Sequence, residues 1–476
     1  MIKNDDAKWR HTHQQARLEE ILPNGVVRCH LSPRNCTLRE GQHGFCGVRM
    51  NRNGRLVTLN YGKSVHATEE TIETEAVNHF SPGERILSMG NIGCMLNCAY
   101  CHNWKTSQAK YVEDKDVYHY TPEQVVDIAL RHGIRMLSWT YNDPVVWHEF
   151  VRETAMLARQ KGLMNLYKSA FYITPEAVEE LLPLMDIFSI SLKAIDEEYY
   201  RKYTTGRLQP VLDGIKQVYR AGVHLEVSNL MITDISDDEG SARKMADWVL
   251  KELDATVPLH FVRFHPDYRM RDTVRTPIPR LIRAREVALE MGVEQVYLGN
   301  VYDTPFSNTY CKDCGTLLID RFGLNAKAEG LDEKGCCRKC GRNAHVKMRG
   351  PVGAPSFVET IPASEVLERK TFQWHGDVRS LHVQARNASA QPVKLYVRRT
   401  LSNGTAPWRV VQLSPQESFR FIIAQSMPNE TGCEVLLPKD LQTNLHEVFD
   451  RAHFPTVSIE QTGIQSTDVT PLPAYR

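Results

Sequence analysis

Strand-like and helix-like segments alternate between Glu84 and about Val301, and this alternation constrains the fold more than any other feature of the sequence. One helix-like stretch begins after Thr174, an N-cap followed by proline at the first helical position, and another ends at Gly222, a helix stop. Repeated alternation predicts an α/β fold in which helices surround a parallel sheet, closed or partly closed into a barrel. The strand-like runs are RILSMGN, RMLSWTY, MNLYKSA, DIFSISLKA, HLEVSNLMI, PLHFVRFHP and EQVYLGN.

Three cysteines follow the first strand-like run, at Cys94, Cys98 and Cys101, and we call residues 94–101 the cysteine loop. In barrels of this kind the chemistry sits in loops after the carboxyl ends of the strands. A four-iron cluster normally takes four thiolates, so a loop that supplies three leaves one iron open to a small molecule. The alternatives are a closed site with a distant fourth cysteine, zinc, or c-type haem at Cys98-x2-Cys101-His102. Haem is disfavoured because it is attached outside the cytoplasm and does not need Cys94.

The composition favours a globular protein with metal sites. A length of 476 residues predicts two to four domains, and 58 basic against 57 acidic residues disfavour nucleic acid as a partner. The start has no apolar signal-peptide core and no apolar run is long enough to cross a membrane, so we expect a cytoplasmic protein. Twelve cysteines are poor candidates for disulfides there, and eleven of them fall into three tight groups.

We expect four parts along the chain. After Pro355 apolar residues alternate with period two, as at Leu381, Val383 and Ala385, which predicts an antiparallel β-sandwich. The parts are a Cys-containing N-terminal segment (1–83), a partial (β/α)6-type barrel (84–306), a zinc-ribbon-like cysteine module (307–350) and the C-terminal β-sandwich (355–476).

The third cysteine group has the spacing of a metal knuckle pair. Cys311-x2-Cys314 and Cys337-x2-Cys340 are separated by 22 residues, close to zinc-ribbon spacing. The spacing favours structural zinc, with an auxiliary iron–sulfur cluster as the alternative. Cys336 is expected to be a spare.

The first cysteine group is less regular. Cys29, Cys36 and Cys46 supply three thiolates, too few for a closed four-cysteine site. Three interpretations stay open: a degenerate structural knuckle, a zinc site of three cysteines and one histidine, or an auxiliary cluster.

The stretch CMLNCAYCHNW, with Tyr100 before the last cysteine, resembles the motif of the radical S-adenosylmethionine (SAM) superfamily. Further stretches are similar to the radical SAM protein of the AmmeMemoRadiSam system, a group related to the pyruvate formate-lyase activating enzymes. They are WTYNDPVVWHEF, EVSNLMI, HFVRFHPDYRM, YLGNV and NTYCKDCGTLLIDRFG. The resemblance covers roughly residues 20–345.

The resemblance implies a four-iron, four-sulfur cluster whose open iron chelates the amino and carboxylate groups of SAM. An electron from the reduced cluster would cleave a C–S bond, and the 5′-deoxyadenosyl radical would abstract hydrogen from a substrate. The barrel would supply orientation and a dry site. The implied partners are an electron donor such as flavodoxin or ferredoxin and a small-molecule, peptide or protein substrate.

The resemblance also implies roles for individual residues. Asn142 and Asp143 would hold the SAM amino group, although relatives have glutamate at the second position, and a simple Asn-Asp-Pro turn is the alternative. Ser228 and Asn229 would lie near the ribose, and the backbone around Gly299 near the adenine. The residues expected to face the substrate are His265, Asp267 and Tyr268, and a purely structural His265 is the alternative.

Two departures from the family concern the pocket. Relatives read TNGYITPE after the third strand where this chain reads SAFYITPE, so Phe171 is expected to narrow or reshape the pocket. Relatives also read DLK on the fourth strand, where this chain has Ser191, Leu192 and Lys193. In the activating enzymes, acidic residues at these places resemble ligands of a monovalent cation. We expect Lys168 to supply that positive charge here, with a solvated lysine as the alternative.

The leading interpretation is therefore an enzyme that cleaves SAM and abstracts hydrogen. Its substrate is a small molecule or peptide, or alternatively a protein glycine, as in glycyl-radical activation. The interpretation from another class is a metal-stapled binding module without catalysis. The cysteine module lacks the interleaved basic and aromatic stripe that nucleic-acid binding needs, which makes a nucleic-acid partner improbable.

Overall fold

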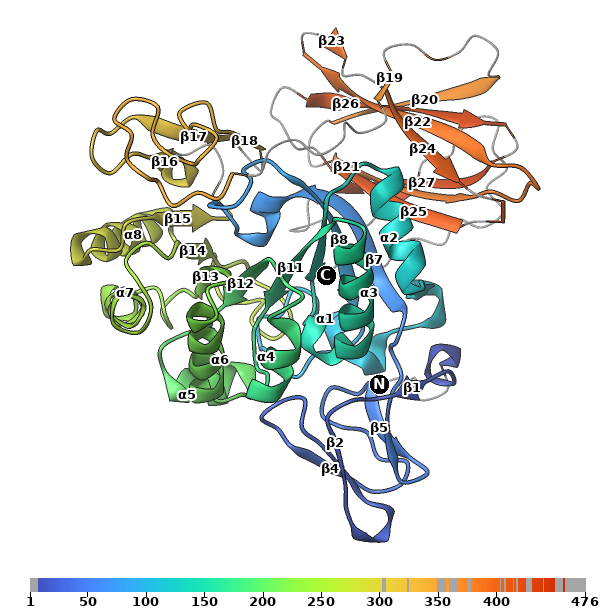
Figure 1. Ribbon diagram of the computed structural model, residues 1–476, viewed down its shortest axis with the longest axis horizontal. Helices are drawn as coiled ribbons and strands as arrows, with labels where there is room; N and C mark the ends of the chain where they lie inside the picture. The colour runs from blue at the N-terminus through green and yellow to red at the C-terminus, as the bar shows by residue number, and fades with distance from the viewer. Residues whose placement is uncertain are drawn as a thin grey trace.

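The computed structural model describes residues 7–301, 305–322, 325–348 and most of the strands between 357 and 458 (Figure 1). Its centre is one mixed sheet of nine strands, in the order β15-β14-β13-β12-β11-β10-β8-β7-β9. Seven of them run parallel: β8 (Arg85–Asn91), β10 (Met136–Thr140), β11 (Met164–Ser169), β12 (Ile187–Ser191), β13 (His224–Met231), β14 (Leu259–Arg263) and β15 (Val296–Gly299). These are the seven strand-like runs, so the prediction of an α/β fold with a parallel sheet is confirmed.

Two antiparallel strands extend this sheet. β7 (Lys63–Thr71) pairs with β8, and β9 (Tyr118–His119) pairs with β7. The path of described strands thus ends at β9 and β15 instead of closing. The expected boundary at residue 83 falls between β7 and β8, which pair with each other. The division into four parts and the six-unit barrel stay predictions.

Helices cover the outer face of the sheet (Figure 1). α2 has a capping box at Thr121 and Gln124, and α4 starts with the expected Thr174–Pro175 pair. No helix among the described residues combines the length and apolarity needed to cross a lipid bilayer. The α- and π-helices of the described residues are α1 (Trp104–Ser107), α2 (Pro122–Arg131), α3 (His148–Gln160), α4 (Pro175–Leu181), α5 (Glu197–Tyr199), the π-helix η7 (Tyr200–Thr204), α6 (Leu208–Arg220), α7 (Glu239–Glu252) and α8 (Ile278–Met291).

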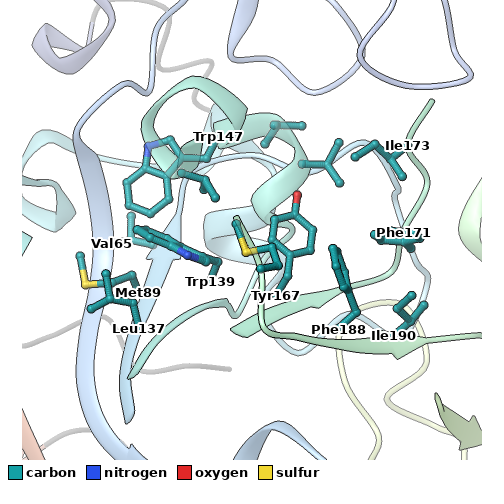
Figure 2. Close-up of a cluster of buried hydrophobic side chains, with 14 of the residues drawn as sticks. Val65, Met89, Leu137, Trp139, Trp147, Tyr167, Phe171, Ile173, Phe188 and Ile190 are labelled. Carbon is teal, nitrogen blue, oxygen red and sulfur yellow. The ribbon is translucent and has the colours of Figure 1, made fainter. Parts of the chain in front are cut away.

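Aromatic side chains fill the space between sheet and helices (Figure 2). Trp139, Tyr167 and Phe188 are register partners on β10, β11 and β12, and all are buried. Phe171 packs against Phe188, with ring centroids 5.6 Å apart, and it also reaches α6, where a Cβ at Gly214 would lie 2.9 Å from its ring. The expectation that Phe171 narrows the pocket is therefore wrong, because its ring belongs to this outer core.

The N-terminal segment lies at the carboxyl end of the parallel strands, and the cysteine module lies at their amino end (Figure 1). The segment forms two three-stranded sheets: β1 (Gln14–Gln15), β6 (Arg55–Thr58) and β5 (Arg49–Arg52), then β2 (Glu19–Ile21), β3 (Val27–Cys29) and β4 (Cys36–Leu38). The module contains β16 (Thr309–Tyr310), β17 (Leu317–Phe322) and β18 (Asn325–Lys327).

The C-terminal strands form two antiparallel sheets, as period two predicts, and β25 runs beside β7 of the central sheet. Leu381, Val383 and Ala385 are buried. Face-to-face packing of the two sheets as a sandwich stays a prediction. One sheet holds β19 (Phe357–Val358), β24 (Trp408–Leu413), β22 (Val393–Leu401), β26 (Glu430–Pro438), β20 (Leu367–Gln373) and β23 (Gly404–Thr405); the other holds β25 (Ser418–Ala424), β21 (Val378–Arg386), β27 (Gln442–Phe449) and β28 (Val457–Ser458).

Candidate active site and cysteine groups

The cysteine loop leaves the carboxyl end of β8 and is held by three distant segments. The backbone N–H groups of Asn97 and Ala99 donate to carbonyls of η7 at 3.0 and 2.8 Å. The N–H of Arg269, from the loop after β14, donates to the Ala99 carbonyl at 2.9 Å. The Arg34 guanidinium of the N-terminal segment donates to a further loop carbonyl at 2.6 Å. The backbone bonds therefore fix the loop without using its thiols. A π-helix such as η7 is rare and frequently marks a functional site.

The three thiols of the loop are partly buried in a setting that favours a bound metal group over free thiolates. Burial raises the pKa of Cys98 to about 12, and the positive charge of Lys193 opposes this rise. Burial likewise raises the pKa of Cys94 and of Cys101, and Ser107 opposes the rise at Cys101. Thiolates in such a place form when a cation binds them, because coordination deprotonates the sulfur.

The spacing of the thiols fits a cluster better than one ion. Among the described residues, the sets of ligand atoms that all lie within 4.8 Å of one another belong to Cys311, Cys314, Cys337 and Cys340, and to His102, His265 and Asp267. The cysteine loop does not form such a compact set. A four-iron cluster is larger than an ion and holds its cysteines at different corners, so a wider spacing of three thiols is compatible with it.

Gly93 is expected to be indispensable for the entry into this loop. Its φ is +90°, and a Cβ there would lie 2.9 Å from the Cys46 carbonyl oxygen and 3.0 Å from a methyl of Val48. Gly93→Ala should therefore lower the free energy of unfolding by about 2–4 kcal/mol, from the left-handed backbone and the crowding together. It should also reduce the iron bound on reconstitution.

Gly162→Ala is the matched control for this prediction. Gly162 also has a positive φ of +78°, but a Cβ there would meet nothing within 4 Å. Gly162→Ala should lower the free energy of unfolding by about 1 kcal/mol and leave the iron content unchanged. Equal losses of stability and iron in the two variants, measured by urea unfolding and metal analysis, would contradict the crowding argument.

Asn142 and Asp143 follow β10, beside the cysteine loop. The fully buried Asp143 carboxylate accepts hydrogen bonds from the Ser169 hydroxyl at 2.8 Å and the Ala170 N–H at 2.9 Å. Burial raises the pKa of Asp143 to about 6 in spite of these bonds. The Asn142 amide donates to the Asn91 carbonyl. Asp143 thus ties the ends of β10 and β11 together, a role that the sequence did not predict.

Lys168, Ser191 and Ser228 come together inside the sheet, as their assignment to one site requires. The Lys168 ammonium donates to the hydroxyls of Ser189 at 3.0 Å and Ser228 at 3.1 Å, and the Ser191 and Ser228 hydroxyls lie 3.2 Å apart. Burial lowers the pKa of Lys168 to about 8, although the Glu75 carboxylate opposes this. Lys168 is half-buried and its ammonium is bonded to two hydroxyls, which disfavours its interpretation as a solvated surface lysine.

Lys193 is the lysine whose charge acts on the cysteine loop. It lies just beyond β12 and favours ionisation of Cys98, Cys101 and Asp143. The Asn229 amide donates to the carbonyls of residues 192 and 193 at 3.0 and 2.9 Å and so fixes this stretch. Gly299 ends β15, where a Cβ would lie 3.0 Å from a Val262 methyl.

Aromatic and imidazole rings lie beside the cysteine loop. We call the group formed by His102, Trp104, His265 and Tyr268 the rim. Tyr268 stacks on Trp104, with centroids 5.2 Å apart and planes 12° apart. The His265 ring lies 5.4 Å from the His102 ring at 90°. Burial and then the nearby Arg275 lower the pKa of His265. Tyr100 is buried against Tyr199 of α5, below this rim.

The two outer cysteine groups differ in geometry. Cys311 and Cys340 place their Sγ atoms 3.5 Å apart and Cys314 and Cys337 place theirs 3.7 Å apart, and the four thiols converge as a tetrahedral zinc site requires.

The first group does not converge in this way. Cys29 faces Cys36 across β3 and β4, but with Cys46 they form no set of three thiols within 4.8 Å among the described residues. His30 hydrogen-bonds Asn35 and Glu20. This arrangement disfavours a zinc site with a histidine ligand, while the degenerate structural knuckle and the auxiliary cluster both stay predictions.

Comparison with known proteins places this site in a family. The radical SAM superfamily matches residues 91–249. The uncharacterized protein MJ0808 of Methanocaldococcus jannaschii is 37% identical over 337 residues, which span 70% of this chain and 100% of that protein. The pyruvate formate-lyase 1-activating enzyme of Escherichia coli is 22% identical over 176 residues, 35% of this chain and 69% of the enzyme.

Solved structures are similar at a lower level. A radical SAM methyltransferase from Sphaerobacter thermophilus has a TM-score of 0.36 and 14% identity, and the match covers 50% of this chain and 71% of that one. Family membership implies a four-iron cluster and SAM as cofactors. On the sequence matches, the chain belongs to the radical SAM superfamily and is related to the pyruvate formate-lyase activating enzymes.

Proposed function

We propose that the chain is an enzyme that holds a four-iron cluster with Cys94, Cys98 and Cys101 and abstracts hydrogen from a small-molecule or peptide substrate. The observation that carries the proposal is the three-thiol loop at the carboxyl ends of the strands, fixed by backbone bonds and lying within the matched region. A cluster held by Cys94, Cys98 and Cys101 would supply one-electron reduction of SAM, with the electron drawn from a flavodoxin- or ferredoxin-type donor. Cleavage of the C–S bond would give methionine and a 5′-deoxyadenosyl radical, which would take hydrogen from the substrate.

The residues around the loop have separable roles in this proposal. Lys193 supplies positive charge beside the thiolates and the cofactor carboxylate, while Asn142 and Asp143 fix the wall that receives the amino group. Ser228, Asn229 and the backbone at Gly299 line the nucleoside side of the site. These elements hold and orient the cofactor, and the buried surroundings exclude water from it.

The rim is the proposed contact with the substrate. His265 and Tyr268 lie after β14 within reach of the cysteine loop, to which the adjacent Arg269 N–H is bonded. The Trp104–Tyr268 stack offers an apolar wall, and the His265 imidazole offers a hydrogen-bonding group. Similarity to the activating enzymes supports a second candidate substrate, a glycine of a protein partner.

The test is an anaerobic assay of the full chain. The protein is reconstituted with iron and sulfide, reduced with dithionite and given SAM, and 5′-deoxyadenosine is measured. The proposal predicts this product, with about four irons in the loop cluster. The same sample also tests the four-cysteine group, Cys311, Cys314, Cys337 and Cys340. One zinc per chain would assign structural zinc to this group, and about four further irons would assign it an auxiliary cluster. No 5′-deoxyadenosine from fully loaded protein, with candidate peptides and glycyl-radical enzymes also added, would contradict the proposal and leave the non-catalytic binding module.

Lys168 gives a sharper prediction about the cofactor site. We propose that its ammonium replaces a monovalent cation, so Lys168→Ala should slow 5′-deoxyadenosine formation at least ~10-fold, the effect of about 1.4 kcal/mol of lost electrostatic stabilisation. Added potassium should restore part of the rate, because the hydroxyls of Ser189, Ser191 and Ser228 stay in place as oxygen ligands.

Lys161→Ala, an exposed lysine after α3, is the control and should change neither rate nor potassium dependence. An unchanged rate in Lys168→Ala would show that the ammonium serves only to balance the Glu75 carboxylate.

A further inference from the structure

We propose that His102, His265 and Asp267 bind a divalent transition-metal ion at the rim beside the cysteine loop, separate from the iron cluster and from the four-cysteine group. One ligand atom from each residue lies within 4.8 Å of the other two, and all three side chains are partly exposed. None of the three belongs to either cysteine group.

The backbone brings these residues together. His102 follows the last cysteine of the loop after β8, whereas His265 and Asp267 lie in the loop after β14. The His102 ring donates from Nε2 to the His265 carbonyl oxygen at 3.0 Å, and the Arg269 N–H joins the same two loops through the Ala99 carbonyl at 2.9 Å. These two bonds to main-chain oxygens hold the two loops next to each other and so keep the three side chains close.

The same bond sets the tautomer of His102. A carbonyl oxygen only accepts, so Nε2 carries the proton and the lone pair lies on Nδ1. Histidines that bind metals in proteins commonly donate their other ring N–H to a backbone carbonyl in this way. The Asp267 carboxylate is oriented as well, since it accepts the N–H of Tyr268 at 2.6 Å.

The donor set indicates the class of ion. Two imidazoles and one carboxylate suit Fe²⁺, Zn²⁺ and other first-row divalent ions, and three protein ligands leave coordination positions open. Those positions would accept water or an oxygen of a carboxylate- or phosphate-bearing molecule. The metal site does not depend on radical chemistry; its use in holding the substrate rests on the proposed function.

The test uses cobalt as the probe. Full-length protein with its iron cluster reconstituted, its four-cysteine group filled and SAM present is dialysed anaerobically against Co²⁺, and cobalt per chain is counted. We expect one bound cobalt ion and at least ~10-fold weaker binding in Asp267→Asn and in His102→Gln. Asp267→Asn keeps an oxygen for the Tyr268 N–H, so the loop should stay folded. Asp272→Asn, an exposed residue of the same loop, is the matched control and should bind cobalt as the unmodified protein does.

X-ray absorption of the cobalt-loaded unmodified protein gives a second readout that needs no variant. Nitrogen and oxygen neighbours with the scattering pattern of imidazole are expected, whereas a sulfur shell would place the ion at cysteines and overturn the proposal. Two further results would overturn it. One is cobalt binding that Asp267→Asn and His102→Gln leave unchanged, and the other is no binding above that of a chain that carries both substitutions. Neither result depends on 5′-deoxyadenosine formation, so this proposal and the proposed function can fail separately.

Discussion

Cys98→Ala is expected to fold, to keep the metal of its four-cysteine group and to lose the loop cluster together with all 5′-deoxyadenosine formation. Two thiolates cannot hold a four-iron cluster that already lacks a fourth protein ligand. The fold should survive, because the loop is held by the backbone groups of Asn97 and Ala99 and by Arg34, none of which the substitution removes.

Metal analysis, the visible absorption of the cluster and chromatography of the assay mixture measure this prediction. Cys336→Ala is the matched control, since Cys336 is partly buried in the cysteine module and belongs to neither compact group of ligand atoms. It should retain iron and activity. A Cys98→Ala chain with full iron and normal product would contradict the assignment of Cys98 as a ligand.

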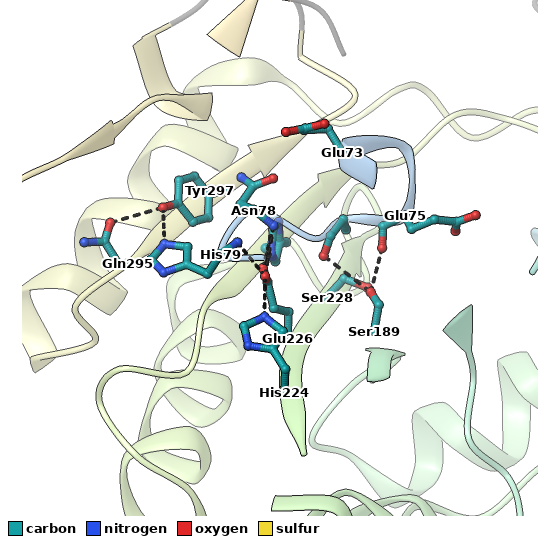
Figure 3. Close-up of polar contacts among 12 residues, drawn as sticks. Glu73, Glu75, Asn78, His79, Ser189, His224, Glu226, Ser228, Gln295 and Tyr297 are labelled. Atoms are coloured by element: carbon teal, nitrogen blue, oxygen red, sulfur yellow. Dashed lines mark hydrogen bonds and ion pairs between the residues drawn. The ribbon is translucent and has the colours of Figure 1, made fainter. Parts of the chain in front are cut away.

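Glu226→Gln is expected to lower the free energy of unfolding by about 3–5 kcal/mol, the cost of breaking a buried ionic network from one side. Glu226 lies on β13, fully buried (Figure 3). Its carboxylate accepts the N–H groups of Asn78 and His79 at 2.9 and 2.7 Å and the Nε2–H groups of His224 and His260 at 3.0 and 2.7 Å. Glutamine would turn one oxygen into a donor that faces other donors.

The same network gives the prediction a pH dependence. Burial opposes ionisation of Glu226, but the hydrogen bonds from His224 and His260 outweigh it and hold its pKa well below the usual range. A depressed carboxyl pKa adds stability above the unfolded pKa, about 4.3, and this stability is lost as the pH falls toward the folded pKa. The difference in the free energy of unfolding between the unmodified chain and Glu226→Gln should therefore become smaller below about pH 4.

Urea unfolding at neutral and acidic pH measures both statements. Glu239→Gln, an exposed carboxylate on α7, serves as the control and should change stability little at either pH. A Glu226→Gln effect below about 1 kcal/mol at neutral pH, or a difference that does not become smaller in acid, would show that the network is not built around an ionised carboxylate.

The strands of the central sheet could be predicted because each is a local run of β-branched and apolar residues between turn residues. The spacing of the four-cysteine group was informative for the same reason: both knuckles, Cys311 with Cys314 and Cys337 with Cys340, are short and local. The cysteine loop combined spacing with a position after a strand, and the structure places it at that edge of the sheet.

The interior of the sheet could not be predicted in this way. Glu75, at the end of η3 (Ile72–Glu75), accepts hydroxyl hydrogen bonds from Ser138 at 2.9 Å and Thr140 at 2.8 Å. The segment around Glu75 also contacts β13 and the cysteine module. These hydrogen-bond partners lie more than 60 residues away in the sequence, and one lies more than 200 residues away. No spacing or periodicity in the sequence signals such contacts.

Single residues were misread where a side chain had two available faces. Phe171 was expected in the pocket, but its positive φ of 59° and the small Gly214 of α6 place the ring in the outer core. His102 belongs to a haem-like C-x2-C-H pattern in the sequence, but its bond to the His265 carbonyl makes it part of the rim.

The most direct test of the account is whether SAM binds the open iron of the loop cluster. The reduced holoprotein is mixed with SAM labelled with nitrogen-15 in the amino group and oxygen-17 in the carboxylate, and electron–nuclear double resonance is recorded. Hyperfine coupling of both labels to the cluster is expected, because three thiolates leave one iron free to chelate them. A fully loaded, reduced cluster whose spectrum shows neither coupling would contradict the central claim.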